Sequence, residues 1–125
     1  MKKIVSTNNA PAAIGPYSQA TVHNQVLYVS GQLPIDPASG DMVEGDISQE
    51  THRVMKNVAA IVEAAGGKME NVLKATILLT DMGHFAAVNE VYASYFPENP
   101  PARICYQVVA LPKGARVEVD AICGL

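Results

Sequence analysis

Apolar residues recur along the chain with two different spacings, and each change of spacing marks a new element. Over residues 47–65 they recur every three or four positions, which predicts an amphipathic helix. Asp46, followed three residues later by Gln49, predicts a capping box where this helix begins, and Gly66-Gly67 predicts its end. A second helical pattern covers residues 81–96 and ends before a proline.

Runs rich in β-branched and other apolar residues predict strands around these helices. The runs cover residues 2–6, 17–22, 26–30, 72–79, 103–111 and 115–122. Three polar residues, 23–25, separate the second run from the third, which predicts a hairpin. Pro112-Lys113-Gly114 predicts a turn that joins the last two strands into another hairpin. Residues 31–45 are rich in Gly, Pro, Asp and Ser and predict a loop.

The order of these elements predicts an α+β fold, with a single domain over residues 1–125 in which two helices pack on one sheet. Two helices cover one face of such a sheet. The runs at 26–29, 77–79 and 104–111, however, are apolar at positions that point to both faces. A sheet with two apolar faces needs a second covering layer, and another copy of the chain is the simplest one. The sequence therefore predicts a closed homo-oligomer.

Composition and charge narrow the possible functions. The chain has 125 residues, of which 49% are hydrophobic and 17% charged, and its formal net charge is −3, without a run of Lys or Arg. We therefore expect a globular domain with no nucleic-acid partner. No apolar run approaches the roughly 20 residues that span a bilayer, and the polar residues after Lys2-Lys3 do not form a secretory signal. These features favour a cytoplasmic protein without a membrane partner.

The residue types that bind metals and cofactors do not form a known motif. Cys105 and Cys123 are too few for a disulfide framework, and their spacing to the three histidines is not that of a metal site. The chain also lacks a glycine-rich phosphate-binding loop and a Ser-His-Asp order. The sequence therefore predicts no metal and no organic cofactor.

Charged residues inside two predicted strands are the first candidates for chemistry. Arg103 and Cys105 share one face of their strand, and Glu118 and Asp120 share one face of the last strand. Such charges are costly to bury without partners. Three explanations fit: a salt bridge between Arg103 and Glu118 across the predicted hairpin, exposure at a sheet edge, or a site that binds an anion.

Tyr17 and Ser30 are weaker candidates, because each also has an ordinary structural explanation. Both lie at the ends of predicted strands, where ligand-binding groups are common. A tyrosine in this position also fits a core, and a serine before Gly31 also closes a turn. The residues alone therefore predict an oligomeric α+β domain with a candidate anion site.

Several separated motifs resemble one known family. Residues 101–108 read PARICYQV and lead through LPKG at 111–114 to VEV at 117–119. This order closely resembles the signature of the RidA family, also called YjgF/YER057c/UK114. The resemblance continues in APAAIGPYSQ at 10–19, VSGQ at 29–32, Asn57 and VNEVY at 88–92. It covers nearly the whole chain, and the number of motifs in the same order makes it specific.

The resemblance implies a chorismate-mutase-like α+β fold, a homotrimer and active sites in the clefts between subunits. It also implies an enzyme that hydrolyses small reactive 2-imino acids, or their enamine tautomers, to 2-keto acids and ammonia without a cofactor. The typical substrates of the family are 2-iminopropanoate, the tautomer of 2-aminoacrylate, and 2-iminobutanoate. Enzymes that depend on pyridoxal phosphate release these compounds when they eliminate water from serine or threonine.

The resemblance also assigns roles to individual residues. Arg103 is expected to hold the substrate carboxylate through two parallel N–H bonds, which lysine cannot supply. Glu118 is expected to position and deprotonate water, and Tyr17 to reach in from a neighbouring subunit and close the pocket. Further substrate contacts are expected from Ser30 and from backbone groups of Gly31 and Cys105.

Two residues depart from the family pattern, and we expect them to change the range of substrates rather than the activity of the predicted site. Ile104 stands where the family has a small residue, with its side chain expected to point away from Arg103, and Val109 stands where the family has alanine. Three other functions stay open: an endoribonuclease that inhibits translation, as described for some relatives, a non-catalytic trimer that binds 2-keto acids, and a chaperone-like role through an apolar surface. The acidic balance disfavours the first, and two acidic residues on one strand favour an enzyme over the second.

Overall fold

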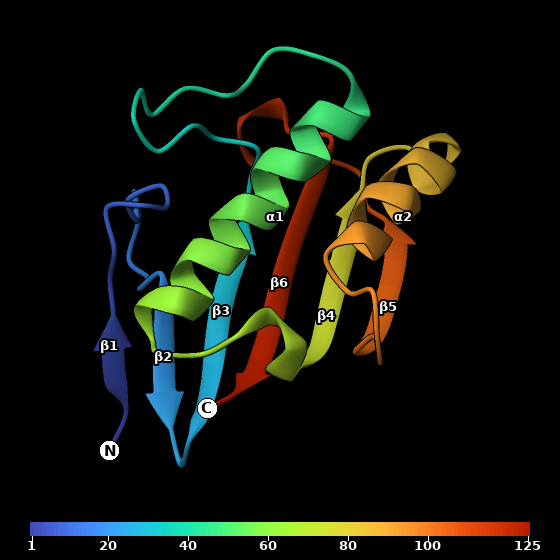
Figure 1. The fold of residues 1–125 in the computed structure, drawn as a ribbon. Coiled ribbons are helices and arrows are strands. Elements are labelled where there is room, and N and C mark those ends of the chain that lie inside the picture. The colour runs from blue at the N-terminus through green and yellow to red at the C-terminus, as the bar shows by residue number, and fades with distance from the viewer.

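The computed structural model describes residues 1–125 as a six-stranded mixed sheet with both helices on one face (Figure 1). The strands are β1 (Lys3–Val5), β2 (Ala20–His23), β3 (Val26–Gln32), β4 (Val72–Leu79), β5 (Ala102–Gln107) and β6 (Val117–Gly124), and the helices are α1 (Ile47–Ala64) and α2 (Phe85–Ser94). The strand order is β1-β2-β3-β6-β4-β5, in which only β4 and β5 are parallel neighbours. The predicted α+β class, with one sheet and two helices, is confirmed. Neither helix is both long enough and apolar enough to cross a membrane.

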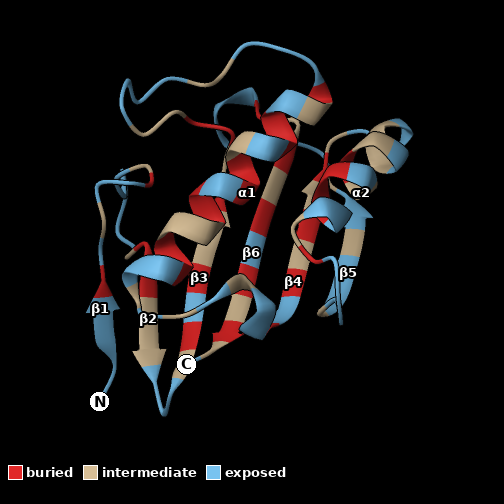
Figure 2. Ribbon diagram, viewed as in Figure 1, coloured by how far each residue is buried: buried red, intermediate tan, exposed pale blue.

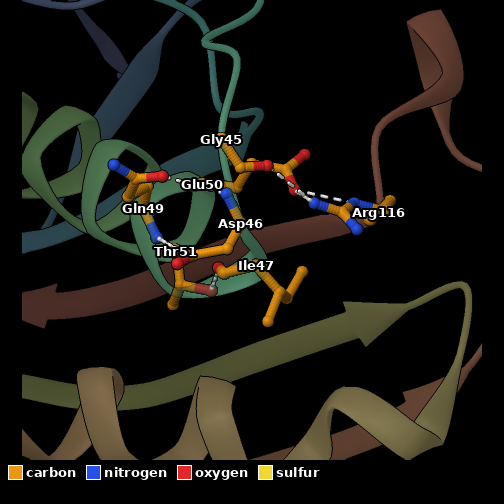
Figure 3. A network of polar contacts seen from close by, with 7 residues as sticks. All are labelled: Gly45, Asp46, Ile47, Gln49, Glu50, Thr51 and Arg116. Atoms are coloured by element: carbon orange, nitrogen blue, oxygen red, sulfur yellow. Dashed lines mark hydrogen bonds and ion pairs between the residues drawn. The ribbon is translucent and has the colours of Figure 1, made fainter.

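Helix α1 begins as its sequence predicts. The Asp46 carboxylate accepts the backbone N–H of Gln49 at 2.8 Å, and the Gln49 side chain accepts the N–H of Asp46 at 2.9 Å, which completes the predicted capping box (Figure 3). The helix ends at Ala64, and Gly66 follows with a φ of 82°, a left-handed conformation that favours glycine. The apolar stripe of α1 packs on β3 and β6, where it forms the centre of the core (Figure 2).

The sheet buries one face under the helices and leaves the other face uncovered. On β6, alternate residues from Val117 to Cys123 are at most 4% exposed and lie on the side of α1. The opposite face carries Tyr28, Ile104 and Tyr106, which are 48%, 45% and 51% exposed. The prediction that apolar residues point to both faces of the sheet is therefore confirmed, and the chain itself covers only one face. The uncovered face also carries the charged Glu118 and Asp120.

The predicted hairpin between the last two strands is wrong. β5 lies at the edge of the sheet and pairs in parallel with β4, whereas β6 lies between β3 and β4 and is antiparallel to both. A parallel pair needs a long crossover connection, and α2 provides it between β4 and β5. The turn at Pro112–Gly114 reverses the chain, but β6, the strand that follows it, pairs with β3 and β4 rather than with β5.

Several other boundaries differ from the predicted ones by a few residues. The first hairpin is confirmed, but its turn consists of Asn24 and Gln25, whose φ values of 48° and 62° are typical of a two-residue type I′ turn. β3 continues to Gln32, so the predicted loop begins later, and a bridge between Ile35 and Met42 crosses it. β2, β5 and β6 also begin or end away from the predicted positions. Strand ends depend on where the partner strand stops, which local propensity does not reveal.

An ion pair that the sequence did not predict, between a buried carboxylate and a partly exposed guanidinium, joins α1 to the start of β6. Glu50 is 6% exposed, and its carboxylate meets the guanidinium of Arg116, with Arg116 Nε 2.7 Å from Glu50 Oε2 (Figure 3). Arg116 Nη2 contacts the same oxygen and also donates to the Gly45 carbonyl at 3.2 Å. The pair therefore fixes the N-terminal end of α1 against the strand that carries Glu118.

Arg116→Ala is expected to lower the free energy of unfolding by roughly 1–3 kcal/mol, because it leaves the buried carboxylate of Glu50 without its partner, while solvent beside the partly exposed guanidinium limits the loss. Glu50→Gln is the matched control. It removes the charge at the same place, so it is expected to cost less. Thermal unfolding of both variants and the wild type measures the two effects. Equal melting temperatures for Arg116→Ala and the wild type would show that solvent, rather than Arg116, stabilises the carboxylate.

Candidate active site

A cavity of about 490 Å³ lies beside the last residues of β3 and the first residues of β6. Four of the predicted site residues line it, and we call it the Glu118 cavity: Tyr17, Ser30, Gly31 and Glu118. Most of the remaining wall comes from two segments outside the helices and strands, residues 7–18 and 33–43. Glu118 is the only acidic residue in this wall, and Lys113 is the only basic one. No three His, Cys, Asp or Glu side chains in the structure are grouped to hold a metal ion.

A bulge in β3 places Gly31 against Glu118. The register between β3 and β6 shifts at Ser30 and Gly31, where two residues of β3 face one residue of β6. A methyl group added at Gly31 would lie 2.9 Å from the carboxyl carbon of Glu118, closer than packed side chains come. Because glycine has no side chain, the Glu118 carboxylate can occupy the space beside the backbone of Gly31.

The surroundings of Glu118 favour its protonated form. Burial raises the pKa of the Glu118 carboxyl above that of an exposed glutamate, and the negative charge of Asp120, two residues along the same strand face, raises the pKa further. No basic side chain forms a salt bridge with Glu118. A carboxyl group with a raised pKa takes up and releases protons closer to neutral pH, which suits it to general acid–base chemistry.

Ser30 and Tyr17 occupy different positions in the wall of this cavity. The Ser30 hydroxyl donates to the Ser18 carbonyl at 2.6 Å, and the Ser30 N–H donates to the Gln19 carbonyl at 3.0 Å. Ser30 therefore holds the segment that carries Tyr17 against the bulge, in addition to lining the cavity. The Tyr17 side chain is 49% exposed, so its phenol is available to a ligand.

Arg103 lies apart from the Glu118 cavity, on the face of the sheet that carries α2. The register of the parallel pair sets Arg103 beside the buried Ala75. Arg103 Nη1 donates to Asn89 Oδ1 at 2.7 Å, and the guanidinium carbon lies 5.1 Å from the ring centroid of Tyr92 and 5.6 Å from that of Phe85. Arg103 stays exposed, so its other N–H groups are free for a ligand. The sequence did not reveal these contacts, although two of the three residues lie in the VNEVY motif.

Cys105 follows Arg103 on the same face of β5 and packs partly against the core. Burial raises the pKa of the Cys105 thiol, and the positive charge of Arg103 offsets only part of this increase. The thiol is therefore protonated at neutral pH, and a protonated thiol is a poor nucleophile. This environment favours a role for the Cys105 backbone rather than for its sulfur.

Arg103 and Glu118 lie on opposite faces of the sheet within one chain. Glu118 alternates with the buried Val117 and Val119, so it points away from the helices, whereas Arg103 contacts α2. The salt bridge between Arg103 and Glu118, one interpretation of the sequence, is therefore wrong. One chain gathers four of the six predicted residues around the Glu118 cavity and leaves Arg103 and Cys105 outside it.

The chain is similar over nearly its whole length to proteins of one family. Residues 7–124 match the family described as Endoribonuclease L-PSP. A protein of Bos taurus named 2-iminobutanoate/2-iminopropanoate deaminase is 52% identical over 122 residues, which cover 98% of this chain and 89% of the bovine one. A solved structure described as a putative endoribonuclease from Thermotoga maritima has a TM-score of 0.98 at 46% identity and covers 100% of this chain and 98% of its own. The structure of RidA from the Antarctic bacterium Psychrobacter sp. has a TM-score of 0.95 at 42% identity, over 98% of this chain and 99% of its own. The chain therefore belongs to the endoribonuclease L-PSP family, the family of RidA that its motifs predicted.

Proposed function

We propose that this protein hydrolyses small reactive 2-imino acids and their enamine tautomers to 2-keto acids and ammonia. The observation that carries the proposal is a partly buried carboxyl group with a raised pKa, Glu118, in a cavity with no other acid. A general acid–base group of this kind accelerates the addition of water to a C=N bond. The bovine relative, named as a deaminase of 2-iminobutanoate and 2-iminopropanoate, supports the same substrate class.

We propose further that the fold is chorismate-mutase-like and that three copies form a ring with shared active sites. The exposed Tyr28, Ile104 and Tyr106 give the uncovered face of the sheet an apolar surface that a neighbouring copy would cover. Arg103 and Glu118 belong to opposite faces of one chain, so Arg103 of one subunit would serve the Glu118 cavity of the next. A closed ring repeats this contact three times and leaves no open end.

In the shared site, Arg103 binds the carboxylate of the substrate. A guanidinium donates two parallel N–H bonds to a carboxylate, and such charge-assisted bonds are strong and directional. Asn89 occupies one N–H of Nη1, and the rings of Phe85 and Tyr92 lie against the guanidinium, so the edge left for the substrate is oriented before binding. The bound carboxylate then sets the position of the adjacent C=N carbon.

Glu118 carries the proton transfers. Its carboxylate takes a proton from water as the water oxygen attacks the C=N carbon, and passes this proton to the imine nitrogen, which gives a carbinolamine. It then moves the hydroxyl proton of the carbinolamine to the same nitrogen, the C–N bond breaks, ammonia leaves and the oxygen becomes the keto group. Tyr17 lines the same cavity as Glu118 of its own chain, so it comes from a neighbouring subunit only relative to Arg103. Its phenol donates a hydrogen bond to the substrate as it closes the site. One water molecule is consumed for each imine.

A coupled assay tests this function. A dehydratase that depends on pyridoxal phosphate supplies the imine from serine or threonine, and semicarbazide traps the imine that remains. Adding this protein is expected to speed the appearance of the 2-keto acid and to reduce the amount of trapped imine. If neither quantity changes when the protein is present at the concentration of the dehydratase, the proposed hydrolysis is wrong.

The family description as an endoribonuclease names a second activity, and a parallel assay with RNA distinguishes the two. A formal net charge of −3 disfavours binding to RNA, whose phosphates attract basic surfaces. RNA is therefore expected to stay intact under conditions in which imines are hydrolysed. Binding of 2-keto acids without any decrease in trapped imine would instead identify a non-catalytic binding protein.

Cys105→Ala is expected to keep kcat/KM for imine hydrolysis within roughly tenfold of the wild type, because the substitution preserves the backbone groups. Burial raises the pKa of the thiol, so the reactive thiolate is scarce in the wild type as well. The coupled assay on both proteins measures the difference. A loss of ~10³ or more would show that the sulfur takes part directly.

A further inference from the structure

Most of the wall of the Glu118 cavity comes from residues 7–18 and 33–43, which lie outside the helices and strands. The second segment pairs with itself, through Asp36 N–H to the Asp41 carbonyl and Val43 N–H to the Pro34 carbonyl. Neither segment pairs with a strand of the main sheet, so many of their backbone groups need other partners. A side-chain amide, with one acceptor and two donors, can replace a partner strand. Two buried amides do this, Gln19 for the first segment and Asn57 for the second.

Gln19 is 4% exposed and binds the backbone of the first segment at several points. Its side-chain oxygen accepts the N–H of Thr7 at 2.7 Å, and its nitrogen donates to the Thr7 carbonyl at 3.0 Å. The same nitrogen donates to the carbonyl of Pro11 at 2.8 Å and, less closely, to that of Ala10 at 3.3 Å. Because Pro11 lines the cavity, Gln19 holds a wall residue directly.

Asn57 is fully buried on α1 and binds the second segment. Its Nδ2 donates to the carbonyls of Leu33 at 3.1 Å and Ile35 at 2.9 Å, and both of these residues line the cavity. Its Oδ1 accepts from Arg53, with Nη2 at 2.9 Å and Nε at 3.2 Å. All polar groups of the Asn57 side chain are therefore engaged, and the helix fixes the wall through them.

We propose that Gln19 and Asn57 are positioning residues that set the affinity for substrate by holding the two walls of the Glu118 cavity in place. Neither residue lines the cavity, and both side chains are occupied by the protein, so they do not touch the substrate. The proposal rests on the proposed imine hydrolysis and concerns substrate binding rather than proton transfer. A wall that is ordered before the substrate arrives costs less entropy on binding. Loss of either amide should therefore raise KM and change kcat little.

Asn57→Ala tests the second wall, with Val58→Ala as the matched control. Asn57→Ala is expected to raise KM about tenfold, to keep kcat within about threefold, and to speed amide hydrogen exchange in residues 33–43. Val58 is the next residue of α1, is 1% exposed and lies in the core. Val58→Ala is expected to lower the melting temperature by leaving a cavity, with KM and the exchange of residues 33–43 unchanged.

Gln19→Ala is an independent test at the first wall, and it decides the question if Asn57→Ala does not fold. It is expected to speed exchange in residues 7–11 and to raise KM by a similar factor. Folded variants with a wild-type KM would overturn the proposal, even if their wall segments exchange faster. Failure of the proposed function looks different, because the wild type itself would then hydrolyse no imine.

Discussion

Arg103→Ala is expected to lower kcat/KM for 2-imino acids by about ten- to a few-hundred-fold while the protein stays folded. Two charge-assisted N–H bonds to a carboxylate contribute on the order of 1.5–3 kcal/mol, and about 1.4 kcal/mol corresponds to a factor of ten. Misplacement of the substrate adds to the loss. Stability is expected to change little, because Arg103 is exposed and has no salt-bridge partner that would be left buried.

Arg103→Lys separates the charge of this residue from its geometry. Lysine keeps the positive charge but lacks the planar fork, so this variant is also expected to fall well below the wild type. kcat/KM and the melting temperature are measured on the same samples of both variants. A folded Arg103→Ala protein that hydrolyses imines at nearly the wild-type rate would mean that another group binds the carboxylate.

Glu118→Gln is expected to lower kcat by about 10²–10⁴, the contribution typical of a general acid–base group. Glutamine has the shape of glutamate and fits beside Gly31, but it cannot accept a proton from water. Because burial raises the pKa of Glu118, the ionised form is disfavoured in the folded protein, and the variant is expected to be at least as stable as the wild type at neutral pH. Loss of activity without loss of melting temperature would separate a catalytic role from a structural one.

The pH dependence of the wild type follows from the same raised pKa. Glu118 accepts a proton only when it is ionised, so activity is expected to fall as the pH drops through this pKa. Asp120→Asn removes one of the two causes of the shift, so the acid limb of the profile should move to lower pH. An acid limb that stays in place in Asp120→Asn, or a Glu118→Gln variant with a wild-type kcat, would point to a different base.

Sequence patterns predicted those features of the fold that have local causes. Asp46 and Gln49 cap α1 through bonds between residues three positions apart, so the pair is recognisable in the sequence. The presence of apolar residues on both faces of the sheet follows from the alternation of residues along each strand. The same alternation correctly predicted that Ile104 points away from Arg103.

Strand pairing and long-range contacts could not be predicted in this way. Alternation shows that Arg103 and Cys105 share a face, but the position of β5 in the sheet decides which face that is. The turn after Leu111 indicates a reversal of the chain, and it does not reveal that β6 lies between β3 and β4. The pair of Glu50 and Arg116 joins residues 66 positions apart, and neither residue belongs to a motif that indicates a partner.

Mixed trimers test directly whether neighbouring subunits share an active site. Arg103→Ala and Glu118→Gln chains, each nearly inactive alone, are combined in equal amounts and refolded together, with trimers verified by sedimentation. In a random mixture about three quarters of the trimers contain both kinds of chain. In each of these trimers, one of the three clefts combines an intact Arg103 with an intact Glu118. About one quarter of the wild-type activity is therefore expected to return. If each site lay within one chain, no cleft would regain both residues. A mixture as inactive as the two separate variants would contradict the shared site.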